Sequence, residues 1–161
     1  MRTRTVLGVL LIGLAATALA SCGIPRDPNG ALENIRRTGV LRAGFTAHDP
    51  WVTAGAGGPE ADVVTAFARS LGARVEWHNG AESKLFEALE KFELDVVVGG
   101  MTDDNPWAPM LGVTRPYVEA GGKRHVIAVA PGENGLLMAF ERVLRAHASD
   151  VAARVGGTPM S

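Results

Sequence analysis

The chain has 161 residues, of which 47% are hydrophobic and 20% are charged, and its formal net charge is -1. This length and balance predict one packed globular domain with short terminal segments. The near-neutral charge offers no basic field for nucleic acid, so we expect no nucleic-acid partner. The single cysteine excludes an internal disulfide and a zinc site built from several cysteines, and we expect no cofactor.

The chain opens with two arginines and an uncharged apolar segment, residues 6–19. This segment is shorter than the ~20 residues that a membrane span needs, and it fits the apolar region of a secretory signal. The four residues "LASC" that end at Cys22 resemble the bacterial lipobox. That resemblance implies that Cys22 becomes the first mature residue and carries lipid. An ordinary cleaved signal or an uncleaved anchor is the alternative.

Lipidation of Cys22 predicts a protein of the periplasm that is held on the membrane by its acyl chains. Gly23 follows the cysteine, where an aspartate would favour retention in the inner membrane, so we expect the outer membrane if the host has two membranes. The expected organisation is a signal peptide at 1–21, the lipidated cysteine and a linker at 22–30, one lobe at 31–148 and a flexible tail at 149–161.

Hydrophobic periodicity predicts that helices and strands alternate along the mature chain. Strands are expected at residues 40–45, 73–78, 94–100 and 123–130, and helices at 31–39, 59–71, 82–93 and 134–148. The continuous apolar runs at 94–100 and 123–130 are typical of central parallel strands covered on both faces. The pattern therefore predicts an α/β fold with a mostly parallel sheet and helices on both faces. The charged residues of the 82–93 helix, Glu82 among them, are interpreted as a solvated face.

In open α/β sheets, ligands bind beyond the carboxyl ends of the strands, where the strand order reverses. If the first strand lies between the second and third, its exit loop "TAHDPW" and the loop "GGMTDDNPW" share one crevice. There Gly99 and Gly100 allow close backbone approach to a ligand, Thr102 offers a hydroxyl, and Trp51 offers a flat wall. The alternative is that the glycines only turn the strand and an aspartate caps the next turn.

Four stretches, "GVLRAGFTAHDPW", "GPEADVVTAFARSLGARVEW", "LFEALEKFELDVVVGGMT" and "TRPY", together resemble the extracellular solute-binding protein family 3. These are the receptors that supply polar amino acids to ABC transporters. The resemblance implies the periplasmic-binding-protein fold, in which two α/β lobes close on a ligand. By position, Trp51 matches the aromatic residue that stacks on the ligand, and Gly100 and Thr102 match groups that bond its amino and carboxylate ends.

The sequence departs from that family in two places. Trp107 stands where the family has an arginine that clamps the ligand's carboxylate, and two aspartates add negative charge nearby; Arg115 is close in sequence but lies outside the clamp position. The segment 117–123 is too short to hold a second lobe, so we expect a periplasmic-binding-protein-like single lobe with half a pocket. The expected ligand-binding residues are Trp51, Gly100, Thr102, Asp104 and Trp107.

The leading interpretation is a lipid-anchored lipoprotein that resembles the substrate-binding component of an amino-acid ABC transporter. It would bind a small amino-acid-like solute, or a partner such as an ABC permease or another membrane protein, without catalysis. The alternative is a dehydratase-like enzyme of the same fold that uses Asp49, Asp103 or Asp104 in acid–base chemistry. One open lobe gives little burial to raise a carboxyl pKa, so we do not expect an enzyme. A metal site from His48, Asp49 and Asp103 has only weak spacing, and no metal is expected.

Overall fold

The computed structural model describes residues 27–160, so the signal segment and Cys22 lie outside the described residues. Within them the helices are α2 (Ala31–Thr38), α3 (Pro59–Ser70), α4 (Glu82–Glu90) and α5 (Asn134–Val155), with a 3-10 turn η1 (Ala108–Met110). The strands are β1 (Val40–Phe45), β2 (Arg74–Asn79), β3 (Val96–Val98), β4 (Gly112–Val113), β5 (Val118–Ala120), β6 (Lys123–His125), β7 (Ala128–Val129) and β8 (Thr158–Pro159).

The main sheet has five strands in the order β2-β1-β3-β7-β4. β1 pairs in parallel with both β2 and β3, whereas β7 runs antiparallel to β3 and β4. The expected α/β lobe with a mostly parallel sheet is therefore confirmed. The prediction that 94–100 and 123–130 lie parallel to each other is wrong. The chain returns to the sheet from the edge where β3 ends, so it can only run back against that strand.

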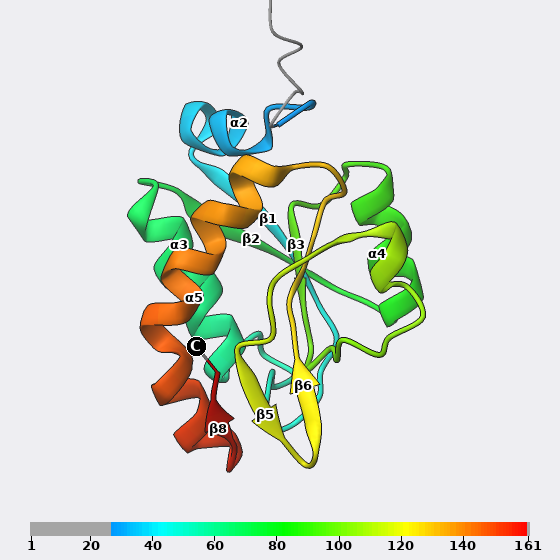
Figure 1. Cartoon of the computed structure of the whole chain (residues 1–161). Coiled ribbons are helices and arrows are strands. Elements are labelled where there is room, and N and C mark those ends of the chain that lie inside the picture. The colour runs from blue at the N-terminus through cyan, green and yellow to red at the C-terminus, as the bar shows by residue number, and fades with distance from the viewer. Residues whose placement is uncertain (1–26, 161) are drawn as a thin grey trace, which may run out of the picture.

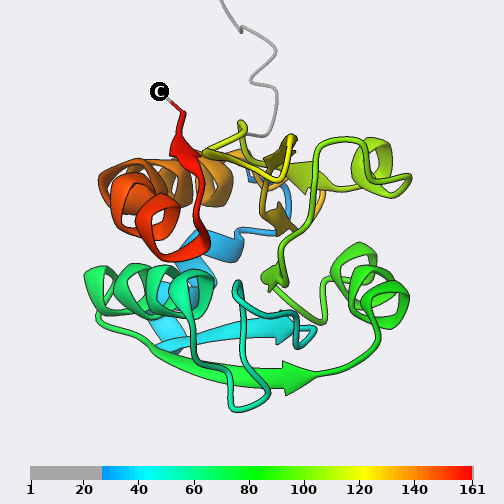
Figure 2. The same cartoon turned by 90° about the horizontal axis from the view of Figure 1, so that it is seen from below.

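Helices cover both faces of the main sheet, with α3 and α5 side by side on one face and α4 on the other (Figures 1 and 2). Phe67 of α3 and Phe140 of α5 meet edge to face, with ring centroids 4.9 Å apart. Strand β3 serves both faces, since Val96 and Val98 pack with the α3 and α5 side and Val97 packs with α4. This two-sided burial explains the uninterrupted apolar run in the sequence.

The expected flexible tail is wrong, because α5 continues to Val155 and β8 follows it. Leu144, Ala148 and Val151 recur at helical spacing and are all buried, so the apolar stripe of the helix extends past the expected boundary. β8 pairs antiparallel with β5, and the backbone N–H of Met160 donates to the carbonyl of Tyr117 at 2.9 Å. The lobe therefore includes the residues as far as 160.

A second sheet of three antiparallel strands, in the order β6-β5-β8, lies at the edge where β1 and β3 end (Figure 1). Gly121 and Gly122 turn the β5–β6 hairpin with φ of 59° and 72°, a conformation that glycine adopts without strain. The hairpin takes up the short segment in which a second lobe would have to begin. Across residues 27–160, no helix combines the length and hydrophobicity needed to cross a membrane.

Candidate functional site

The exit loops of β1 and β3 meet, as the strand order requires. The backbone N–H of Thr46 donates to the carbonyl of Val98 at 3.2 Å, and Nδ1 of His48 lies 2.9 Å from the carbonyl oxygen of Gly99. Because a carbonyl only accepts, His48 holds its proton on Nδ1. The predicted crevice at the carboxyl ends of the parallel strands is therefore present.

A cavity of about 160 Å³ opens at this crevice, between the two loops and α4. It is lined by Thr46, Ala47, His48, Glu82, Phe86, Val97, Val98, Gly99 and Met101. Its lining contains one carboxylate, that of Glu82, and no lysine or arginine. Oε1 of Glu82 accepts a hydrogen bond from Nδ2 of Asn105 at 2.8 Å, which holds the carboxylate beside the loop that follows β3.

Glu82 belongs to the site although its charge pattern suggests only a solvated helix face. It is the first residue of α4, and α4 starts soon after the carboxyl end of β2. A helix that follows a parallel strand begins at the same edge of the sheet as the ligand crevice. The position of Glu82 at the start of the helix after β2, rather than its charge pattern, was the feature of the sequence that indicates a place in the site.

A buried carboxyl group, that of Glu60, fixes the end of β3. Its Oε2 accepts hydrogen bonds from the backbone N–H groups of Gly99 at 2.8 Å and Gly100 at 3.0 Å, and its Oε1 accepts one from the hydroxyl of Tyr117 at 2.6 Å. Burial raises the pKa of Glu60, and the three hydrogen bonds oppose that rise. The sequence reasoning missed this residue, which lies in the first turn of α3.

Trp51 and Gly100 lie together as predicted, but the indole is covered by a residue that the sequence reasoning missed. Trp51 is 5% exposed and stacks on the imidazole of His125, with ring centroids 3.8 Å apart and an interplanar angle of 25°. A Cβ on Gly100 would lie 2.6 Å from Cδ1 of Trp51, so only glycine fits beside the indole. Contact between these residues and an external ligand stays a prediction.

The loop after β3 is held by bonds of its own. The hydroxyl of Thr102 donates to Asp104, and this hydrogen bond, followed by the charge of Lys123 at 3.5 Å, lowers the pKa of Asp104. Asp103 forms an ion pair with Arg124. Both expected negative charges are therefore matched by cations of β6, and the ligand roles of Thr102 and Asp104 stay predictions.

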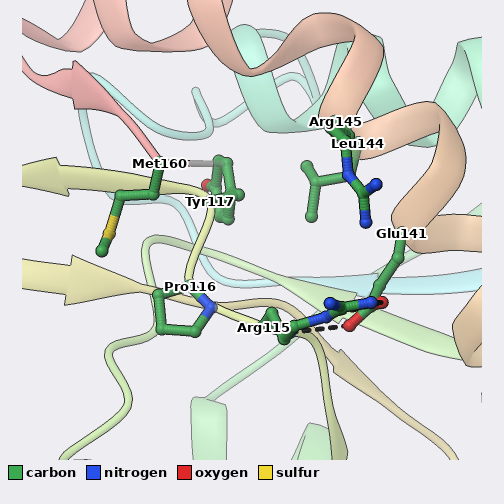
Figure 3. A pocket seen from close by; sticks show the side chains of 7 residues that line it. All are labelled: Arg115, Pro116, Tyr117, Glu141, Leu144, Arg145 and Met160. Atoms are coloured by element: carbon green, nitrogen blue, oxygen red, sulfur yellow. Dashed lines mark hydrogen bonds and ion pairs between the residues drawn. The ribbon is translucent and has the colours of Figure 1, made fainter.

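The cavity receives no positive charge from the two residues considered for the carboxylate clamp. Trp107 is uncharged, and Arg115 does not line the cavity. Trp107 packs against Phe86, with ring centroids 5.8 Å apart. Arg115 bonds Glu141 of α5 instead: its Nη2 lies 3.1 Å from Oε2, and its backbone N–H donates to Oε1 at 2.8 Å (Figure 3). The hollow beside this pair is small, about 30 Å³.

The described part of the chain brings together no group of three or more histidine, cysteine, aspartate or glutamate side chains that could hold a metal ion. His48, Asp49 and Asp103 therefore do not form the metal site that was considered from the sequence. Of the three aspartates considered for catalysis, Asp104 has a lowered pKa, which suits an ionised group and not a proton donor.

The fold and the strand-exit crevice define a single lobe of the solute-binding-protein type. The chain resembles the arginine-bound form of domain 1 from TmArgBP, with 27% sequence identity, a TM-score of 0.62, and coverage of 70% of this chain and 97% of that chain. It also resembles a mutant of ArgBP from T. maritima, with 14% identity, a TM-score of 0.66, and coverage of 78% and 99%. The second likeness shows the fold alone.

No protein-family model matches the chain. Among curated proteins it is similar to "Membrane-bound lytic murein transglycosylase F" of Vibrio cholerae serotype O1, 33% identical over 97 residues, which cover 58% of this chain and 18% of that protein. The protein of the same name from Aliivibrio fischeri is 31% identical over 103 residues, with coverage of 62% and 21%. The chain thus spans about a fifth of the length of the curated relatives that it matches.

These relatives correct one expectation. The sequence reasoning assigned the chain to a non-enzymatic class, but the curated proteins that it matches are named as transglycosylases, which are enzymes. The classification as a non-enzyme is therefore wrong. The relatives are also named as membrane-bound, which agrees with a location in the cell envelope.

Proposed function

We propose that this chain is the solute-binding lobe of a lipid-anchored envelope protein, and that its strand-exit cavity binds a small amino-acid-like solute through an amine or guanidinium group. One observation carries the proposal. The cavity of about 160 Å³ lies at the carboxyl ends of β1 and β3 and contains one carboxylate and no cation. Cavities at such strand ends are the usual ligand sites of open α/β sheets.

The lining favours a positive group over a negative one. Glu82 supplies a carboxylate that can bond ammonium or guanidinium groups, and Phe86 adds an aromatic side chain to the lining. Trp107 replaces the family's arginine and Arg115 is engaged by Glu141, so a free α-carboxylate has no cationic partner here. The arginine-bound neighbour of 27% identity supports the preference for a guanidinium group.

The cellular role is proposed from the relatives and the N-terminal segment. Lipid at Cys22 would hold the lobe on the membrane, and the relatives' names point to murein as the material that is processed nearby. Murein fragments that carry an amine are therefore a second class of ligand to test. A murein-cleaving enzyme is a partner class alongside the ABC permease, and the named relatives favour the former.

The test is calorimetric titration of the full-length chain in detergent with agmatine, arginine and glutamate. Agmatine has the guanidinium group of arginine but no carboxylate, so we expect it to bind at least as well as arginine and glutamate not to bind. Glu82→Gln should weaken agmatine about tenfold, which corresponds to ~1.4 kcal/mol. Glu87→Gln on the same helix is the matched control, because Glu87 pairs with Lys84 and does not line the cavity. Equal binding by glutamate, or no effect of Glu82→Gln, would refute the proposal.

A further inference from the structure

His125 fills the space beside Trp51 and Gly100, the two residues that match ligand contacts in the solute-binding resemblance. Its imidazole stacks on the indole at 3.8 Å, and its Nδ1 lies 3.2 Å from the carbonyl oxygen of Gly100. The side chain is 6% exposed. One flat ring therefore makes both a stacking contact and a hydrogen bond to the end of β3.

The backbone on both sides of His125 is bound to the loop after β3. The N–H of Asp103 donates to the carbonyl of Arg124 at 3.0 Å, and the N–H of Val126 donates to the carbonyl of Met101 at 2.9 Å. His125 itself forms an isolated β-bridge with Thr102. These bonds hold the backbone at His125 beside the loop, and the stacking contact with Trp51 and the hydrogen bond to Gly100 place the imidazole.

We infer that His125 is a built-in occupant of a binding site for flat groups that carry an N–H donor, such as imidazole or guanidinium. Trp51 supplies the stacking surface, and the carbonyl of Gly100 selects for a donor, because a carbonyl oxygen only accepts. The site admits an external group of this kind only when the His125 side chain is absent or displaced. The hairpin thus closes the site from within the lobe, where a two-lobed protein would close it with the second lobe.

This site is separate from the Glu82 cavity, since neither Trp51, Gly100 nor His125 is among that cavity's lining residues. The inference about His125 and the proposed function are tested with different variants and different probes. A failure of one can therefore be distinguished from a failure of the other.

The test is rescue of His125→Gly, in the full-length chain, by imidazole, with thiazole as the matched probe. Thiazole has a flat five-membered ring of similar size but no N–H donor. We expect His125→Gly to unfold at a lower temperature than the wild type. Imidazole at millimolar concentration should raise the unfolding temperature of this variant by several degrees, and thiazole should bind to it at least tenfold more weakly. The wild type and His78→Gly, which removes an exposed histidine of β2, should show no such shift. Equal rescue by thiazole, or no rescue by imidazole, would overturn the inference.

A second measurement does not depend on the variant folding. Nitrogen NMR of the wild-type histidines should find His125 neutral and protonated on Nδ1, with its ring protons shifted upfield by the indole of Trp51. Protonation on Nε2 alone would mean that the hydrogen bond to Gly100 is absent, and it would contradict the inference even if the variant did not fold.

Discussion

The carboxyl group of Glu60 is the most informative single group to perturb, because it joins α3, the end of β3 and Tyr117. It is fully buried and accepts three hydrogen bonds. Replacement by alanine removes the acceptor of all three donors at once. Replacement by glutamine keeps an amide oxygen for the two glycine N–H groups and removes the charge.

The expected magnitudes follow from these contacts. A buried donor left without a partner costs ~1–3 kcal/mol, so the loss of all three acceptors in Glu60→Ala should lower the free energy of unfolding by about 3–9 kcal/mol in total. That is a large share of the ~5–15 kcal/mol that holds a typical domain together. Glu60→Gln leaves only the hydroxyl of Tyr117 without its acceptor, so it should cost about 1–3 kcal/mol at pH 7, well below the cost of Glu60→Ala.

The change of folding stability with pH has a defined sign. Burial raises the pKa of Glu60 above its ordinary value of 4.5, which means that the folded protein favours the protonated form. A carboxyl group with a raised pKa contributes stability that is fully present below 4.5 and is lost as the pH rises through the folded-state value. The stability of the wild type relative to Glu60→Gln should therefore fall as the pH rises from about 4.5.

Urea denaturation followed by circular dichroism measures these differences for the wild type and both variants between pH 4 and pH 8. If Glu60→Gln proves as damaging as Glu60→Ala at pH 7, the negative charge is itself required and the reasoning from hydrogen bonds and burial is refuted. A loss below about 1 kcal/mol for Glu60→Ala would refute it as well, because it would mean that water replaces the carboxyl group.

Three further predictions concern the anchor, the ligand and the N-terminal junction. Cys22→Ser should release the protein from membranes or leave it unprocessed in cell fractionation, and a variant that is cleaved and membrane-bound like the wild type would contradict the lipid anchor. With Trp107 in place of the carboxylate clamp, free α-amino acids should bind no better than millimolar in calorimetry, since losing one partner of a buried ion pair costs ~3–5 kcal/mol; a micromolar amino acid would contradict this. Burial and the neighbouring Glu133 raise the pKa of Asp27 to about 6, so wild-type stability should fall as the pH rises through about 6, while Asp27→Asn should lack that step in urea titrations.

The sequence predicted β1, β2 and β3 because each has a local signal. The short strand β4 was not predicted, and the expected strand at 123–130 is divided into β6 and β7, which belong to different sheets. The apolar run of β3 reflects burial on both faces, and Gly39 ends α2 in the left-handed conformation with φ of 69°. The direction of β7 was not predictable in this way. Burial on both faces fixes that a strand is central, but it does not fix whether the strand runs with or against its neighbour.

The candidate site was predicted in place but not in chemistry. The meeting of the β1 and β3 loops follows from strand order, which the resemblance and the alternation of elements supplied. Glu82 was missed although its position at the start of α4 was a signal, whereas Glu60 and His125 were missed because their roles depend on contacts between residues far apart in the chain. Glu60 meets Gly100 across 40 positions, and His125 meets Gly100 across 25. Nothing in the local sequence distinguishes such a group from an ordinary surface acid or histidine.

The β5–β6 hairpin explains how one lobe can exist without its second half. An open crevice would expose the indole of Trp51 and leave two loop aspartates unpaired, which favours association with other molecules. The hairpin supplies an imidazole to the indole and a cation to each aspartate. The short β5–β6 segment therefore covers the indole and pairs both aspartates, while the cavity beside Glu82 stays open at the same edge of the main sheet.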